Sequence, residues 1–278
     1  MENYICATCG VQHAATEGPP DGCPICQDER QYIGPVGQRW TTMAQLQQDY
    51  HNVIRPAEPN LTGIVTHPEF CIAQRALLVQ TPHGNLLWDC ISLIDDPTVA
   101  ALQALGGVDV IALSHPHLAG SMVDWAHAFD ATIYMHAADR QWAMRPDPSI
   151  EFWEGETLPL FGNGHDAPLT LINTGGHFEG SSVAHWAAGA EGRGALLTGD
   201  TIMVASDRRY VTFMYSYPNM IPLPPGAVRR IVAAVEPFSY DRIYGSWTPR
   251  VIHEGAREAV QRSAERYVAA ITDPDPAL

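Results

Sequence analysis

The sequence has few basic residues and no segment in which they gather. Its 278 residues include 16 Lys and Arg against 31 Asp and Glu, which gives a net charge of −15. Proteins bind nucleic-acid backbones and anionic membrane surfaces through clustered basic side chains, so we expect neither as a partner. This exclusion concerns polymers and membranes, and it does not extend to a small-molecule substrate.

Long apolar runs are also missing. No uninterrupted apolar stretch approaches the roughly 20 residues that a membrane-spanning helix requires. The opening residues, MENYICATCG, have neither the basic start nor the apolar stretch of a secretory signal, so we expect a cytoplasmic protein. Hydrophobic residues make up 46% and charged residues 17% of the chain, a composition typical of soluble globular proteins.

Cysteine is scarce, but four of the six cysteines form two Cys-x-x-Cys pairs. The pairs are Cys6 with Cys9 and Cys23 with Cys26. Four thiolates in a tetrahedral arrangement suit Zn²⁺ or a single iron ion, and a redox-active Cys-x-x-Cys is the alternative. The segment between the pairs is rich in Gly and Pro and too small to fold by apolar burial, so metal binding would supply much of its folding free energy.

This cysteine arrangement resembles that of rubredoxins and zinc ribbons, over about the first thirty residues. A rubredoxin would carry electrons on iron, whereas a zinc ribbon would be structural or would mediate contacts, and the ligands suit both metals. We expect residues 1–35 to form a small Cys₄ domain and residues 36–278 to form a second domain, joined by the linker around Gly34 to Gly37.

Helix and strand signals alternate through the rest of the chain. Short apolar runs between residues 61 and 90, broken by turn residues, predict antiparallel strands. Asp95, Asp96 and Pro97 then predict the start of a helix, and the β-branched run 108–113 predicts a further strand. The expected class is therefore α/β, with the functional site at strand ends.

Four residues that can bind a metal follow predicted strands. His115 and His117 come directly after the run 108–113, where the two-residue period of a strand would point both rings the same way. His177 follows a strand and a Gly-Gly pair, and Asp200 follows a strand and a glycine. Imidazole is the commonest metal-binding side chain, although two surface histidines in a turn remain the alternative for the first pair.

The motifs SHPH, GGHFEGSS and LLTGD, in this order, resemble those of metallo-β-lactamase-fold hydrolases across roughly residues 40–270. The resemblance implies an αββα four-layer sandwich, two face-to-face sheets with helices outside, and a metal site at one edge. It also implies that His115, His117 and His177 hold the first metal, and that Asp200 corresponds to the bridging ligand.

The sequence departs from the family pattern at the second metal position. Ala119 and Gly120 stand where the family has Asp and His, and Ser246-Trp247 stands where the last family histidine is expected. His253 follows a few residues later, and we interpret it as a residue at the end that opens the C-terminal helix rather than as a ligand. We therefore expect a mononuclear core site that binds Zn²⁺, with Fe²⁺ as the alternative.

Three histidines with an open position form a known catalytic zinc set, which predicts a hydrolase acting on an ester, a thioester or a related bond of a small molecule. His177 and Asp200 are the expected catalytic residues, Asp200 either as the fourth ligand or as the group that orients water. Glu179 and Asp124 are further candidates for moving protons. A mononuclear-iron redox enzyme similar to sulfur dioxygenases, with the Cys₄ site as electron carrier, and a non-catalytic scaffold protein are the alternatives.

The segment 207–225 contains four aromatic residues, two methionines and a proline-rich end. Connections of this kind often form the wall of a pocket or contact a partner subunit. We expect that a homodimer or another protein partner, if one exists, would bind through this segment or through the Cys₄ domain.

Overall fold

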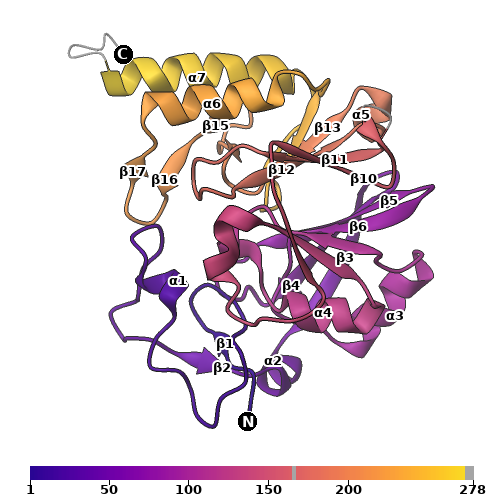
Figure 1. Ribbon diagram of the computed structural model, residues 1–278, viewed down its shortest axis with the longest axis vertical. Helices are drawn as coiled ribbons and strands as arrows, with labels where there is room; N and C mark the ends of the chain where they lie inside the picture. The colour runs from indigo at the N-terminus through magenta and orange to yellow at the C-terminus, as the bar shows by residue number, and fades with distance from the viewer. Residues whose placement is uncertain (165–166, 273–278) are drawn as a thin grey trace. The chain divides into compact units, whose positions relative to one another are not determined.

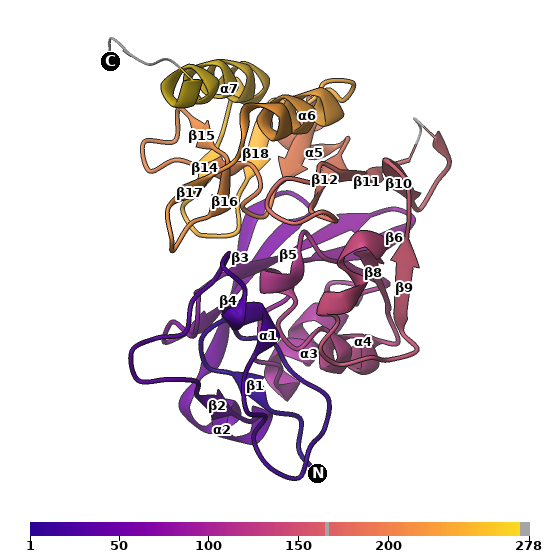
Figure 2. The same ribbon diagram turned by 60° about the vertical axis from the view of Figure 1, so that its left-hand side comes forward.

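The computed structural model describes residues 1–164 and 167–272, and it divides into two compact units, Met1–Trp153 and Glu154–Leu278. Each unit contains one large β-sheet with helices packed against it, so the fold is mixed α/β as expected (Figures 1 and 2). None of the helices in these described ranges is both long and apolar enough to span a membrane.

The first unit is built on a seven-stranded sheet in the order β3-β4-β5-β6-β7-β8-β9. Pairing is antiparallel from β3 to β6 and parallel from β6 to β9. Ile111 in the middle of β7 pairs with Leu87 and Ile133, and all three are fully buried. The strands are β3 (His51–Glu58), β4 (Leu61–His67), β5 (Arg75–Thr81), β6 (Gly84–Trp88), β7 (Val110–Ala112), β8 (Thr132–His136) and β9 (Ile150–Trp153).

Helix α3 begins where the sequence predicts, and side-chain caps mark the starts of both α2 and α3. Thr42 and Gln45 form a capping box at the start of α2, and the Asp95 side chain accepts a hydrogen bond from the Thr98 amide at the start of α3. The helices and helical turns are α2 (Met43–Asp49), α3 (Asp96–Ala104), η1 (Pro116–Leu118), α4 (Met122–Phe129) and η2 (Ala137–Trp142). The apolar face of α4 packs on β7 and β8.

The N-terminal cysteine segment has little regular structure. It contains β1 (Ile5–Cys6), the one-turn helix α1 (Pro24–Gln27) and β2 (Trp40–Thr41), which pairs with β1. All four of its cysteines belong to the same apolar core as the strands β4 to β8 and helix α4. The boundary near residue 35 stays a prediction, and the contacts place this segment within the first unit.

The second unit contains a six-stranded sheet in the order β10-β11-β12-β13-β18-β19. β11 and β13 both pair antiparallel with β12, so they run in the same direction and end at the same edge of the sheet. The strands are β10 (Thr157–Leu160), β11 (Leu169–Asn173), β12 (Ser182–Trp186), β13 (Ala195–Leu197), β18 (Arg242–Tyr244) and β19 (Val251–Ile252).

Helices α6 (Pro225–Val235) and α7 (Ala256–Thr272) pack side by side over this sheet (Figure 1). The helical turn α5 (Gly189–Gly192) connects β12 and β13. Helix α7 begins three residues after His253, whose side chain is exposed, so His253 precedes the helix and does not form its end.

The aromatic segment 207–225 is more structured than a plain connection. Two small antiparallel sheets account for it and the residues before it: β14 (Met203–Val204) with β15 (Val211–Thr212), and β16 (Met214–Ser216) with β17 (Ile221–Pro222). Phe213 is fully buried in the apolar core beneath α6 and α7.

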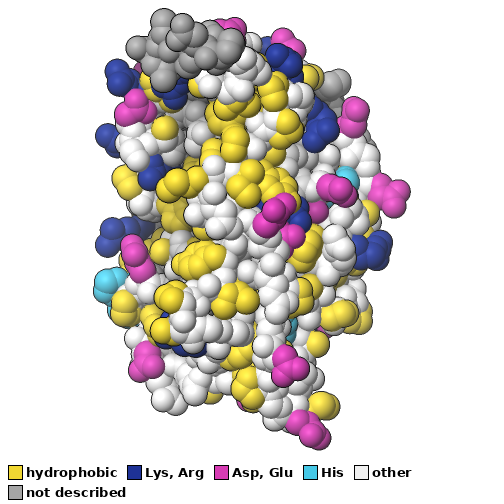
Figure 3. Space-filling view, turned by 90° about the vertical axis from the view of Figure 1, so that its left-hand side faces the viewer, with side chains coloured by type: hydrophobic (Ala, Val, Ile, Leu, Met, Phe, Trp, Pro, Cys, Tyr) yellow, Lys and Arg dark blue, Asp and Glu magenta, His cyan; other side chains and the backbone are white. Residues whose placement is uncertain are grey.

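On the face drawn in Figure 3, arginine and acidic side chains are interspersed, and neither sign gathers into a large block.

Candidate metal centres

The four N-terminal cysteines lie together with the spacing of a tetrahedral metal site. The Sγ atoms of Cys6 and Cys26 are 3.6 Å apart, and those of Cys9 and Cys23 are 3.8 Å apart. These distances exceed the roughly 2.05 Å of a disulfide, and all four thiols are free. Four sulfurs at about 2.3 Å from a central zinc would stand about 3.8 Å from one another. The donor set therefore fits a thiolate-bound ion.

Polar groups around the cysteines favour negative charge on sulfur. The backbone amide of Thr8 and the side-chain amide of Gln38 point at Cys6 Sγ, at 3.4 and 3.2 Å. Hydrogen bonds from Cys26 and the other two thiols lower the pKa of Cys23 far below that of an ordinary thiol. Gln38 lies outside the two Cys-x-x-Cys pairs, so their spacing did not reveal it.

His115 and His117 lie at the carboxyl end of β7, fully within the first unit. The backbone at His115 is extended, but Pro116–Leu118 forms a single 3₁₀ turn rather than a continued strand. The two rings are 5.2 Å apart between centroids and nearly perpendicular, and both side chains are buried. The two rings therefore lie close together, as expected. The tight turn brings them together, and the two-residue alternation of side chains along a strand does not.

The neighbouring residue Ser114 orients the first ring. Ser114 Oγ is hydrogen-bonded to Nδ1 of His115 at 2.9 Å, and the Ser114 amide donates to Oδ1 of Asp89 at 2.8 Å. Asp89 is buried, with a left-handed backbone of φ +59. A second partner on Nδ1 is typical of metal-binding histidines because it leaves Nε2 for the ion.

His177 and Asp200 come together in the second unit because β11 and β13 end at the same edge of the sheet. The Nε2 atom of His177 lies 3.9 Å from Oδ2 of Asp200, and both side chains are buried. Nδ1 of His177 donates to the carbonyl oxygen of Met214 at 3.2 Å. That bond sets the tautomer and leaves Nε2 directed at the carboxylate.

Burial dominates the electrostatics of Asp200. It raises the pKa of this carboxyl to about 8. A cation beside the carboxyl would favour its charged form and offset this cost. The hydroxyl of Tyr217, in the aromatic segment, donates to the carbonyl oxygen of Asp200 at 2.6 Å, and its ring lies 6.0 Å from that of His177. The aromatic segment thus packs over these two residues.

Other polar residues named from the sequence have different surroundings. Asp124 accepts hydrogen bonds from Gln12 and Arg145, and Glu179 is exposed. Thr201 and Ser246 were not named as site residues from the sequence. Their hydroxyl oxygens are buried with no hydrogen-bond partner among the described residues. Ser246 stands where the family pattern has its last histidine.

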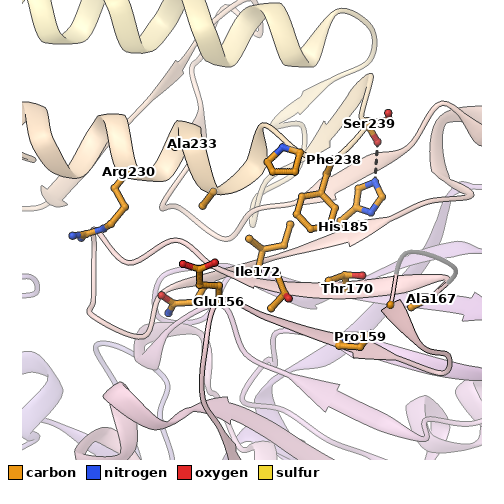
Figure 4. A pocket seen from close by; sticks show the side chains of 15 residues that line it. Glu156, Pro159, Ala167, Thr170, Ile172, His185, Arg230, Ala233, Phe238 and Ser239 are labelled. Atoms are coloured by element: carbon orange, nitrogen blue, oxygen red, sulfur yellow. Dashed lines mark hydrogen bonds between the residues drawn. The ribbon is translucent and has the colours of Figure 1, made fainter.

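A cavity of about 770 Å³ lies elsewhere in the second unit, between the outer face of β10 to β12 and helix α6 (Figure 4). His185 and Phe238 line one end and Arg230 and Glu156 the other. Nε2 of His185 donates to the carbonyl oxygen of Ser239 at 2.8 Å. Neither His177 nor Asp200 lines this cavity.

Comparison with solved structures identifies the fold. A Cronobacter sakazakii metallo-β-lactamase with a HARLDQ motif aligns with a TM-score of 0.52 and 15% identity, over 78% of this chain and 92% of its own. FIM-1 from Pseudomonas aeruginosa aligns with a TM-score of 0.57 and 13% identity, over 78% and 96%. The metallo-β-lactamase DIM-1 aligns with a TM-score of 0.56 and 11% identity, over 78% and 97%. The protein therefore has the metallo-β-lactamase fold, as the motifs predicted.

No family model matches the sequence. The uncharacterized protein YmaE of Bacillus subtilis (strain 168) is 49% identical over 273 residues, which cover 98% of this chain and 97% of YmaE. The chain belongs to the same family as YmaE.

Proposed function

We propose that the protein is a metal-dependent hydrolase in which His115, His117, His177 and Asp200 bind one divalent ion. The observation that carries this proposal is the burial of the four side chains and the hydrogen bonding of two of the histidine rings. Each is buried, and the rings of His115 and His177 each have Nδ1 engaged by a neighbouring polar group. Two such ligands in each unit are too few to hold an ion, whereas the four together make a complete set.

Three neutral imidazoles with a carboxylate fit zinc, and a bound zinc ion supplies a Lewis acid that lowers the pKa of water to near neutrality. Ser114 Oγ and the Met214 carbonyl hold the rings so that each Nε2 is available. Asp200 would either complete the donor set or orient the attacking water. The substrate class is a small molecule with an ester, thioester or related bond.

A single ion is proposed because the second metal position has lost its ligands. Ala119 cannot bind a metal, and Gly120 has no room for a side chain, since a β-carbon there would stand 2.6 Å from the carbonyl oxygen of Ile91. Ser246 offers only a hydroxyl in place of the last histidine. One of the similar structures, FIM-1, is described in a mono-zinc form, which supports one-ion occupancy within this fold.

For the Cys₄ site we propose a structural zinc ion. The alternative is iron, which would make this site an electron carrier for a redox enzyme. Metal analysis of protein purified without added metal separates these readings. Two zinc ions per chain support the hydrolase, whereas a coloured iron-loaded Cys₄ site supports the redox enzyme. A third result is a single ion per chain that is lost when Cys6 and Cys23 are replaced by serine. It would mean that the core site binds no ion, which contradicts both the hydrolase and the redox-enzyme hypotheses and supports a non-catalytic scaffold protein.

Hydrolysis of an activated ester such as p-nitrophenyl acetate tests the reaction. We expect His177→Ala to lose the core ion and the activity together. His127→Ala is the matched control, since this histidine is 55% exposed and pairs with Asp147 instead. Full activity in the His177 variant would refute the proposed site. A cytoplasmic location, and partner contacts through residues 1–35 or 207–225, stay predictions.

A further inference from the structure

We propose that metal binding at the Cys₄ site sets the geometry of the His115–His117 turn, so that the two metal sites are thermodynamically coupled. This inference rests on the proposed function for the core ion, but the contacts that carry it lie entirely within the first unit.

The residues directly after Cys9 are the ones that hold the turn. Cys9 is followed by Gly10, whose carbonyl oxygen accepts a 2.7 Å hydrogen bond from Ser92 Oγ. Two residues on, the amide of Gln12 donates to the carbonyl oxygen of Gly120 at 3.0 Å. Gly120 ends the short segment that begins with His115 and His117. The cysteine segment therefore hydrogen-bonds to the backbone of the histidine motif itself.

A second connection runs through residues 89–92, which lie between the two sites. The Cys90 amide donates to the carbonyl oxygen of Leu118 at 2.9 Å, and Ser121 Oγ donates to the carbonyl oxygen of Ser92. Asp89, at the start of this segment, holds the Ser114 amide beside His115. Residues 89–92 thus contact the cysteine segment through the Ser92 side chain, and they contact the histidine turn through the Cys90 amide and the Asp89 carboxylate.

A partly buried polar network adds a third connection. The side-chain amide of Gln12 donates to Oδ2 of Asp124 at 2.7 Å, and Arg145 donates both to Oδ1 of Asp124 and to Oε1 of Gln12. Asp124 lies in the first turn of α4, four residues after Gly120. Such a network rigidifies its members when every donor is satisfied, and it fails as a unit when one member moves.

The cysteine segment depends on an ion to keep this position. Residues 1–35 contain only a two-residue strand and a one-turn helix, and three of the cysteines contribute fully buried side chains to the shared core. The four sulfurs lie within 4.8 Å of one another, and without a metal no ion holds them in this arrangement. The position of Gly10 and Gln12 then depends on occupancy of the Cys₄ site, and so does the geometry of the His115–His117 turn that they contact.

Coupling of this kind is reciprocal and typically changes an affinity by about 5- to 150-fold. The first test titrates Co²⁺ into the core site of full-length protein whose Cys₄ site already holds Zn²⁺. We expect Gln12→Ala and Ser92→Ala to keep a full Zn²⁺ equivalent on the cysteines and to weaken Co²⁺ binding at the core about tenfold. Glu17→Ala, an exposed change in the same segment, is the matched control and should leave the affinity unchanged.

The second test does not need the core ion. In the His177→Ala background, amide hydrogen exchange of residues 114–121 is compared with and without Zn²⁺ on the cysteines. We expect Zn²⁺ to slow exchange about tenfold, and Gln12→Ala to reduce that protection. An exchange rate that is the same with and without Zn²⁺ would overturn the inference, but it would not contradict the proposed function. Slowed exchange in a wild-type protein that takes up no core ion overturns the proposed function alone.

Discussion

The carbonyl oxygen of Ile91 lies 2.6 Å from the position that a β-carbon on Gly120 would occupy. Gly120 also has a left-handed backbone, with φ +49. Both features exclude a side chain at the place where the family pattern carries a histidine. Packing within the first unit therefore opposes a histidine ligand at position 120.

We expect Gly120→Ala to lower the free energy of unfolding by about 3 kcal/mol, from backbone strain plus overpacking against Ile91. Gly107→Ala separates the two causes, because Gly107 has φ +79 but nothing within 4 Å of an added β-carbon. The control should lose only about 1 kcal/mol. Urea denaturation of both variants measures the difference, and equal losses would mean that the Ile91 contact is not restrictive.

Ser114→Ala removes the partner of His115 Nδ1. Loss of such an orienting group typically weakens metal binding about 10- to 100-fold, because the ring and its tautomer are no longer held. We expect that loss at the core site, measured by competition with a chelator, with Zn²⁺ on the cysteines unaffected. Ser149→Ala is the control, since its hydroxyl bonds only to Asp147 among the contacts described. Unchanged affinity would show that Ser114 has no orienting role.

Tyr217→Phe deletes the hydroxyl that donates to the Asp200 carbonyl. Leaving that buried acceptor unsatisfied should lower the free energy of unfolding by about 1 to 3 kcal/mol and loosen the Asp200 loop. We expect weaker core-metal binding in the same variant. Tyr32→Phe, at a tyrosine that is 50% exposed, should change neither quantity. A stable Tyr217 variant with full metal affinity would contradict the assigned role.

His185→Gln tests a pH effect in the second unit. Burial lowers the pKa of His185 below its ordinary value of 6.5. Below that pH the unfolded chain takes up a proton that the folded protein does not, so the stabilising contribution is complete above pH 6.5 and is lost as the pH falls. We expect the variant to lose less stability than the wild-type protein between neutral pH and about pH 5. Urea titrations at several pH values check this, with His127→Gln as the exposed control.

The donors of both candidate sites, and their order along the chain, were predictable from short-range patterns. The Cys-x-x-Cys spacing needs only four residues to bring two thiols together. His177 and Asp200 each follow a glycine, and each lies within four residues of the end of a strand, β11 or β13. The shape of the histidine motif was not predictable in the same way. The two-residue period of a strand was expected to bring the rings of His115 and His117 together, whereas a 3₁₀ turn at Pro116–Leu118 does so.

The residues that orient the ligands were missed for a related reason. Gln38 approaches Cys6, and Met214 and Tyr217 approach His177 and Asp200, from distant parts of the sequence. No periodicity or spacing links such residues to the ligands, because their contacts arise only when the strands and loops have packed.

Local sequence is enough to predict the candidate metal donors, a helix cap and several strands of this protein, since each depends on side chains within a few positions. The tertiary structure decides how those donors are held. Gln12 reaches the carbonyl oxygen of Gly120 across more than a hundred residues of chain, and the Ile91 carbonyl closes the space beside that glycine. Burial and packing between remote segments determine those contacts, and no short-range pattern in the sequence encodes them.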